Sequence, residues 1–129
     1  MTLTEKQLVD RVYPRPVRFF NQVGSTNDEA MEWLRYGASS GSIVVADEQV
    51  KGKGRLGRVW HTPAGSALIV SVILYPRVEA LQQITMLGAL AIYDMVKNLG
   101  IEQVSIKSVS YTHLDVYKRQ GYRLLVKTI

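Results

Sequence analysis

The chain has 129 residues, of which 47% are hydrophobic and 21% are charged, a composition typical of one ordinary globular domain. It contains no cysteine and two histidines, which excludes disulfides and thiolate chemistry, and we expect no metal site. The net charge of +5 is concentrated in a loop at residues 51–58 and in residues 108–129, which argues against a broad nucleic-acid-binding face. No apolar run approaches the roughly 18 residues of a membrane helix, and the amino terminus has no signal-peptide pattern, so we expect a cytoplasmic protein without a membrane segment.

The first part of the chain is predicted to form a short helix, a strand and a second helix. Residues 4–12 have a helical pattern that two prolines end, and residues 17–20 are a β-type run. Thr26 and Glu29 match a capping box, in which the Thr26 side chain accepts a hydrogen bond from the Glu29 amide. A helix should therefore begin at Thr26 and end at Gly37.

Three strands and a long helix are predicted to follow. Residues 42–48 and 66–75 are apolar runs of strand type, and apolar residues recur at helical spacing over residues 78–99, with Gly100 ending the helix. Residues 101–107 alternate apolar and polar, as a strand does. The order predicts an α+β fold, in which a mixed β-sheet packs with helices, without a second domain.

A glycine-rich basic loop, residues 49–60, separates the second and third predicted strands. Its glycines are expected to adopt positive φ and to bring backbone N–H groups close to an anion, while arginine guanidinium groups bind phosphate or carboxylate oxygens. The spacing matches neither a Walker A loop nor a Rossmann fingerprint. The alternative is a solvated, flexible hairpin tip with no ligand.

Two other segments have a functional and a structural interpretation. Ser25, Thr26 and Asn27 are all good helix caps, and capping alone accounts for them; they can also face a ligand carbonyl or carboxylate at the helix start. Lys107 ends a predicted strand, where a lysine is either a solvated charge or a ligand contact. Trp60 is more often a core or lid residue than a stacking platform.

Taken in order, these motifs resemble the catalytic domain of biotin protein ligases, also called biotin–acetyl-CoA-carboxylase ligases. The resemblance covers residues 17–107 and includes Ser25-Thr26-Asn27, the loop from Gln49 to Trp60, the segment Thr62-Pro63-Ala64-Gly65, and the strand that ends at Lys107. Lys53 replaces the more usual arginine, which keeps the charge and loses the bidentate fork. The resemblance implies an incomplete ligase catalytic domain of the class II synthetase-like fold.

The resemblance implies a two-step reaction, in which biotin and Mg-ATP form biotinyl-5′-AMP, which then acylates a lysine of the biotin carboxyl carrier domain of acetyl-CoA carboxylase. Biotin and ATP with Mg²⁺ are then substrates, and no tightly bound cofactor is expected. The implied biotin-binding residues are Ser25, Thr26, Asn27, Gln49, Gly52, Lys53 and Lys107. The implied adenylate loop comprises Gly52, Lys53, Gly54, Arg55, Gly57, Arg58 and Trp60. Lys107 and Arg55 are the implied catalytic residues.

The resemblance ends at Lys107, where the family pattern continues Trp-Pro-Asn-Asp and this chain has Ser108-Val109-Ser110-Tyr111. We expect residues 1–16 to be a lead-in, residues 17–107 a partial catalytic domain, and residues 108–129 a tail foreign to the family, similar to tails on truncated gene translations. Because later strands and most of the nucleotide site are then missing, we expect an inactive, marginally folded chain with an uncovered sheet edge. Alternatively, the tail pairs as a hairpin at that edge.

Two other functions stay open at this point. A lipoate or octanoyl transferase belongs to the same superfamily, but lacks this basic glycine loop in this form. A small basic phosphate- or nucleic-acid-binding module would use the loop and the tail, although aromatic residues are not interleaved with the loop cations. No helix-turn-helix domain precedes Val17, so a repressor function is not indicated.

Overall fold

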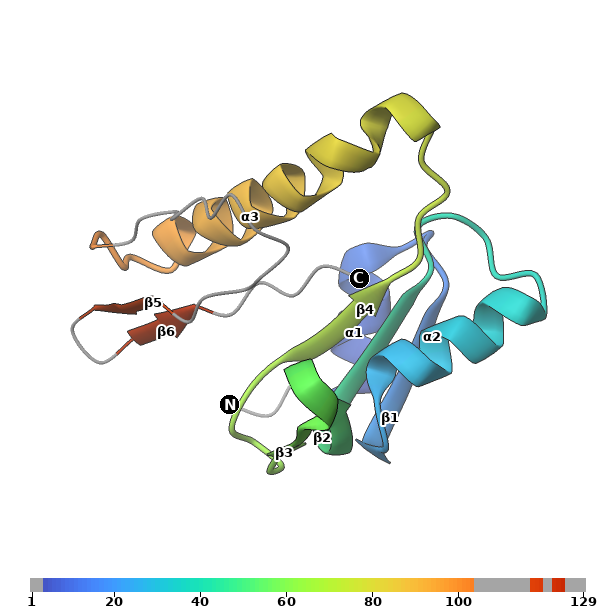
Figure 1. Ribbon diagram of the computed structural model, residues 1–129, viewed down its shortest axis with the longest axis horizontal. Helices are drawn as coiled ribbons and strands as arrows, with labels where there is room; N and C mark the ends of the chain where they lie inside the picture. Colours follow the sequence, from blue (N-terminus) through green and yellow to red (C-terminus); the bar gives the residue numbers. More distant parts are fainter. Residues whose placement is uncertain (1–3, 104–116, 120–121, 125–129) are drawn as a thin grey trace. The chain divides into compact units, whose positions relative to one another are not determined.

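The computed structural model describes residues 4–103, 117–119 and 122–124, and for Arg55, residues 117–119 and residues 122–124 it describes the backbone alone. The chain divides into two compact units, Met1–Tyr75 and Pro76–Ile129 (Figure 1). The first unit contains α1 (Glu5–Val12), β1 (Val17–Val23), α2 (Thr26–Arg35), β2 (Ile43–Lys53), the short 3₁₀ turn η1 (Arg55–Gly57), β3 (Val59–Thr62) and β4 (Ile69–Val72). The second contains η2 (Val78–Ala80), α3 (Leu81–Asn98), β5 (Tyr117–Arg119) and β6 (Tyr122–Leu124).

The sheet of the first unit is built around β2. Strand β1 pairs with β2 in parallel, and α2 is the crossover that parallel pairing requires. On its other side β2 pairs antiparallel with two strands in succession: its first half with β4, where Val44 is opposite Ser71, and its second half with β3, where Gly52 is opposite Trp60. The mixed sheet packed with helices confirms the predicted α+β class.

The core lies between α2 and the sheet. Ala30 of α2, Ala38 after it, Val44 of β2 and Ile73 after β4 form one buried cluster. Phe20, Trp33 and Leu34 are partly buried hydrophobic side chains that pack against this cluster. Residues 30, 33 and 34 share one face of a helix, so the sequence of α2 places its apolar side on the sheet. This packing holds the start of α2 beside Gln49 of β2 and Ser71 of β4.

Several predicted elements are confirmed, whereas the prediction of a loop at residues 49–60 is corrected. The helices over residues 4–12 and from Thr26 form as expected, and Gly37 adopts φ +87° after the second helix. The predicted loop at residues 49–60, by contrast, is mostly a β-hairpin, because β2 continues through Lys53 and β3 begins at Val59. Pairing between the two strands overrides the low β-propensity of the glycines and lysines. The predicted strand 66–75 is shorter, Ile69–Val72.

The second unit contains the long predicted helix. Helix α3 ends as expected, with Gly100 at φ +84° and its amide donating to the Lys97 carbonyl oxygen. Strands β5 and β6 pair antiparallel, which places two short strands in the predicted tail, and the alternative that the tail pairs at the sheet edge stays a prediction. The strand predicted over residues 101–107 is not found at residues 101–103, and residues 104–107, Lys107 included, lie outside the described residues.

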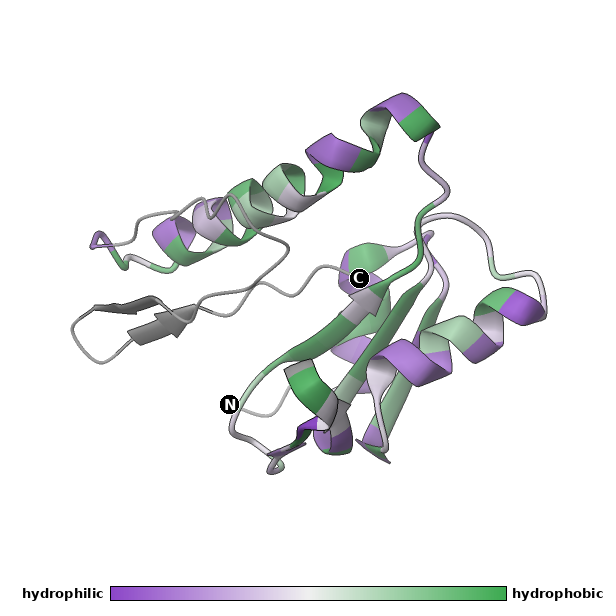
Figure 2. Cartoon of the chain, viewed as in Figure 1, coloured by the Kyte–Doolittle hydropathy of each residue, from purple (hydrophilic) through white to green (hydrophobic). Residues whose placement is uncertain are grey.

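Apolar side chains are exposed in both units. In the first unit, Val70, Val72 and Leu74 are 43%, 51% and 48% exposed. In α3, hydrophobic and hydrophilic residues alternate (Figure 2), and Leu81, Met86, Leu87, Leu90 and Met95 are exposed. Among the described helices, none combines the length and the apolar character that crossing a membrane requires.

Candidate functional site

The start of α2 is capped by Ser25, one residue before the predicted cap. The Ser25 hydroxyl oxygen accepts from the Asp28 amide at 3.4 Å, and its carbonyl oxygen accepts from the Glu29 amide at 3.1 Å. The prediction that Thr26 caps the helix is therefore wrong, because Ser25 is the residue with extended φ and ψ that a cap requires. Since Ser25 caps the helix, the Thr26 hydroxyl is available for other bonds.

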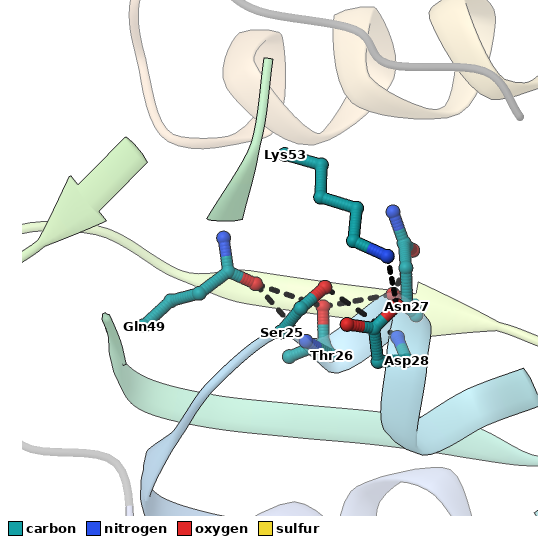
Figure 3. A network of polar contacts seen from close by, with 7 residues as sticks. Ser25, Thr26, Asn27, Asp28, Gln49 and Lys53 are labelled. Atoms are coloured by element: carbon teal, nitrogen blue, oxygen red, sulfur yellow. Dashed lines mark hydrogen bonds and ion pairs between the residues drawn. The ribbon is translucent and has the colours of Figure 1, made fainter. Parts of the chain in front are cut away.

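Gln49, on β2, joins the predicted Ser-Thr-Asn motif to the predicted loop. Its Oε1 accepts from the Thr26 amide at 3.0 Å and lies 3.5 Å from the Thr26 hydroxyl oxygen (Figure 3). A backbone N–H can only donate, so the Gln49 amide is oriented with its oxygen toward α2. The Nε2 group, with two donor hydrogens, then points away from Thr26 and is suited to a carbonyl or carboxylate acceptor.

Ser71, on β4, completes the cluster and was not singled out from the sequence. Its Oγ lies 2.8 Å from the Thr26 hydroxyl oxygen and 2.5 Å from Asn27 Oδ1. Ser71 is 8% exposed and Thr26 is 3% exposed. The sequence feature that could have identified Ser71 is a lone hydroxyl in an otherwise apolar strand. Such a hydroxyl is expected to be buried, and a buried polar group needs hydrogen-bond partners.

Two glycines of the hairpin allow side chains to lie directly against the backbone. A Cβ at Gly52 would come within 2.3 Å of Gln49 Nε2, and a Cβ at Gly54 within 2.2 Å of the Trp60 indole nitrogen. Neither glycine has positive φ, so the expectation of left-handed backbone at these two positions is wrong. Their role is close approach: Gly52 makes room for the Gln49 amide, and Gly54 makes room for the Trp60 ring.

Within the hairpin, the residues with positive φ lie in the turn. Leu56 has φ +57° and Gly57 has φ +72°, so the third loop glycine meets the original expectation. Beside the turn, Lys53 Nζ lies 2.8 Å from Asp28 Oδ1, which connects the hairpin to the first turn of α2. The two side chains are 66% and 54% exposed, so this ion pair is a solvated contact of small energy.

Of the remaining predicted site residues, the structure describes Arg58 and Trp60 in full. Arg58 is exposed at the hairpin turn, and Trp60 is 47% exposed while its ring lies beside Gly54. Arg55 begins η1, and its side chain lies outside the described part of the structure, as does the whole of Lys107. The structure therefore brings together the Ser-Thr-Asn motif, Gln49 and the hairpin, and leaves the contributions of Arg55 and Lys107 as predictions.

A second polar contact crosses the sheet at Glu48, adjacent to Gln49. Glu48 Oε1 lies 3.0 Å from His61 Nε2, and Glu48 Oε2 accepts from Gln22 Nε2 at 3.1 Å. The hydrogen bond with His61, followed by that with Gln22, lowers the pKa of the Glu48 carboxyl from its ordinary 4.5, and partial burial opposes the shift only in part. An anionic carboxylate therefore connects β1, β2 and β3.

The site offers neutral hydrogen-bond donors and acceptors next to a turn flanked by the cationic residues Lys53 and Arg58. It suits a small molecule with a polar head group and an anion. Within the described residues, no group of three or more histidine, aspartate or glutamate side chains could hold a metal ion.

A family model for the Biotin/lipoate A/B protein ligase family matches residues 19–123. The chain belongs to this family. The matched residues include the whole candidate site. They also continue beyond Lys107, the residue at which the motif resemblance ends.

Curated relatives are named as ligases, and one of them as a biotin ligase. The chain is 36% identical over 87 residues to the bifunctional ligase/repressor BirA of Bacillus spizizenii, covering 66% of this chain and 27% of the relative. It is 43% identical over 72 residues to the biotin–[acetyl-CoA-carboxylase] ligase of Paracoccus denitrificans, covering 54% of this chain and 29% of the relative. The chain thus spans less than a third of the length of these curated relatives.

The fold is also that of a solved ligase. The crystal structure of the biotin acetyl coenzyme A carboxylase synthetase of Helicobacter pylori with bound biotinylated ATP superposes with a TM-score of 0.59. The superposition covers 89% of this chain and 62% of the other, at 23% sequence identity. At 23% identity this likeness shows a shared fold and nothing about function.

Proposed function

We propose that the chain forms the biotin-binding part of a biotin protein ligase catalytic domain. The observation that carries the proposal is the 3.0 Å hydrogen bond from the Thr26 amide to Gln49 Oε1. It joins the two motifs on which the resemblance rests, which are 23 residues apart in the sequence. The name of the relative from Paracoccus denitrificans supports biotin as the ligand.

The reaction of the complete domain has two steps. A carboxylate oxygen of biotin attacks the α-phosphorus of ATP, and pyrophosphate leaves, which gives biotinyl-5′-AMP. The amine of a carrier lysine then attacks the acyl carbon, and AMP leaves. Because the first step brings two anions together, preorganised cations and hydrogen-bond donors supply most of the acceleration.

The proposed roles are those that the family resemblance implies. Ser25, Thr26 and Asn27 at the start of α2, together with the Nε2 group of Gln49, bind the polar ring of biotin. The hairpin from Gly52 to Trp60 closes over the acyl-adenylate, and Lys53, Arg55 and Arg58 neutralise phosphate charge. Lys107 stabilises charge between the carboxylate and the α-phosphate. The described residues offer no ligand set for Mg²⁺, and we assign it no step.

We infer further that the acceptor is the biotin carboxyl carrier domain of acetyl-CoA carboxylase, modified in the cytoplasm. The relative from Paracoccus denitrificans, a biotin–[acetyl-CoA-carboxylase] ligase, supports the acceptor. The absence of cysteine is compatible with a reducing compartment.

A competition titration separates biotin from lipoate, the other ligand class of the family. Isothermal titration of the chain with biotin should give saturable binding with one site, and excess lipoate should leave the biotin dissociation constant unchanged. Gln49→Ala should abolish or strongly weaken binding, whereas Ser42→Ala, a substitution of a buried serine at the opposite end of β2, should not. Binding of lipoate in place of biotin would favour the lipoate ligase alternative.

The catalytic roles are tested in a complete relative. Alanine in place of the residues equivalent to Arg55 or Lys107 should raise the barrier of adenylate formation by about 2 to 4 kcal/mol. Full activity of either variant would contradict the assignment.

A further inference from the structure

We propose that Ser71 is a positioning residue of this site: it holds the Thr26 and Asn27 side chains in their binding orientation and does not contact ligand itself. The proposal rests on the proposed function for the identity of the ligand, biotin. Its structural part, the fixing of two side chains by one hydroxyl, stands on the described contacts alone.

The first argument is the geometry of the Ser71 hydroxyl. Its oxygen lies within hydrogen-bond distance of Thr26 Oγ1, at 2.8 Å, and of Asn27 Oδ1, at 2.5 Å. The hydroxyl has one hydrogen, so it donates to one of these oxygens at a time. When it donates to Thr26 Oγ1, the Thr26 hydrogen is directed toward Gln49 Oε1; when it donates to Asn27, it holds the amide oxygen of that side chain. An amide oxygen can only accept, so Ser71 engages both neighbours at once when it donates to Asn27 Oδ1 and accepts from the Thr26 hydroxyl; in that arrangement one atom limits the orientation of both.

The second argument is that helix formation does not need these bonds. Ser25 caps α2 and satisfies the Asp28 amide, and Gln49 satisfies the Thr26 amide. The bonds of Ser71 are made to side chains of the first helical turn, from a strand 45 residues later than Thr26. Their effect is therefore on the rotamers of Thr26 and Asn27, which capping leaves undetermined.

The third argument is burial. Ser71 is 8% exposed and lies in an apolar strand, between Val70 and Val72. A buried hydroxyl is unfavourable unless hydrogen bonds compensate for the lost solvent. Valine or alanine would suit the strand as well, so the serine is explained by what it holds. Because its hydroxyl is engaged by the Thr26 and Asn27 side chains, it acts through these two residues.

The test combines a ligand-free measurement with a binding measurement on the full chain. In ligand-free protein, NMR three-bond couplings should report one χ1 rotamer for Thr26 and for Asn27, and rotamer averaging at both in Ser71→Ala. Ser71→Thr, which keeps the hydroxyl, should preserve the single rotamers. Ser42→Ala removes a similarly buried hydroxyl, bonded to Ser39 at 3.2 Å, and should leave both rotamers unchanged.

For biotin binding, Ser71→Ala should weaken affinity by about threefold to tenfold, the effect of one lost hydrogen bond. In a Thr26→Val background the same change should have a smaller effect than in wild type, because Ser71 then acts through Asn27 alone. Unchanged rotamers in Ser71→Ala would overturn the proposal, as would an undiminished effect in the Thr26→Val background. If wild-type protein does not bind biotin, the proposed function fails, while the NMR couplings still decide whether Ser71 positions its neighbours.

Discussion

Replacing Gly52 by alanine tests the packing of the site directly. The added Cβ would lie 2.3 Å from Gln49 Nε2, and 3.1 Å from both the Cβ and the carbonyl oxygen of Trp60. Ordinary contact begins at 3.4 Å, so the Gln49 amide must move by about 1.1 Å. Because Oε1 and Nε2 belong to one rigid amide, a shift of that size takes Oε1 out of hydrogen-bond range of the Thr26 amide.

The energetic cost has two parts. Losing the bond to the Thr26 amide costs on the order of 1 kcal/mol, and the tight contacts with Trp60 add about 1 to 3 kcal/mol of overpacking. We therefore expect Gly52→Ala to lower the free energy of unfolding by about 2 to 4 kcal/mol and to weaken biotin binding, since Gln49 is displaced.

Urea unfolding followed by circular dichroism measures this change, with two glycine controls. Gly88→Ala in α3 meets no atom within 4 Å and should stabilise the chain by about 0.5 to 1 kcal/mol. Gly57→Ala also meets no atom within 4 Å but has φ +72°, so it should cost about 1 to 2 kcal/mol through backbone strain alone. If Gly52→Ala were as stable as wild type and bound biotin equally well, close approach would not be the reason for this glycine.

Three further changes should have distinct effects. Ser25→Ala removes the cap of α2 and should lower the free energy of unfolding by about 1 kcal/mol in the same urea assay, and no loss would contradict the cap assignment. His61→Ala removes the main cause of the lowered Glu48 pKa. Because a lowered carboxyl pKa stabilises the folded state at pH values above the unfolded pKa, the variant should be less stable than wild type at pH 6. The unfolding curves of the two proteins should converge as the pH falls below 4.5. A gap that persisted under acid would assign the effect of His61 to another contact. Finally, the exposed Val70, Val72 and Leu74 should bind the hydrophobic dye ANS, and cooperative melting without ANS fluorescence would refute the expected marginal folding.

The fold could be predicted largely from local patterns. Apolar spacing in residues 30–34 and 81–95 is helical, and the β-branched run at the start of β2 is typical of a buried strand, so the class and most elements follow from the sequence. The sequence predicts a loop here because glycine and lysine have low β-propensity, whereas the pairing of Gly52 with Trp60 and of Lys53 with Val59 extends β2 through these residues. Such pairing depends on residues that are not adjacent in the sequence.

For the site, the sequence predicts most of the residues that belong to it but not the hydrogen bonds between them. The sequence identifies Thr26 and Gln49, but nothing local shows that the amide of one donates to the side chain of the other. Both Ser25 and Thr26 are acceptable caps, and the tertiary partners of Thr26 decide between them. Ser71 was missed because a single serine in a strand has no spacing that marks it, and its role depends on contacts from a strand to a helix.

The central claim is that the start of α2 and the adjoining hairpin bind biotin, and an NMR titration of the ¹⁵N-labelled chain with biotin tests it most directly. The account predicts saturable chemical-shift changes concentrated at the Thr26 amide, the Gln49 side-chain amide and the Gly52 amide, and the same changes in the control variant Ser42→Ala. A folded chain whose spectrum biotin leaves unchanged, or changes only in residues remote from these three, would contradict it.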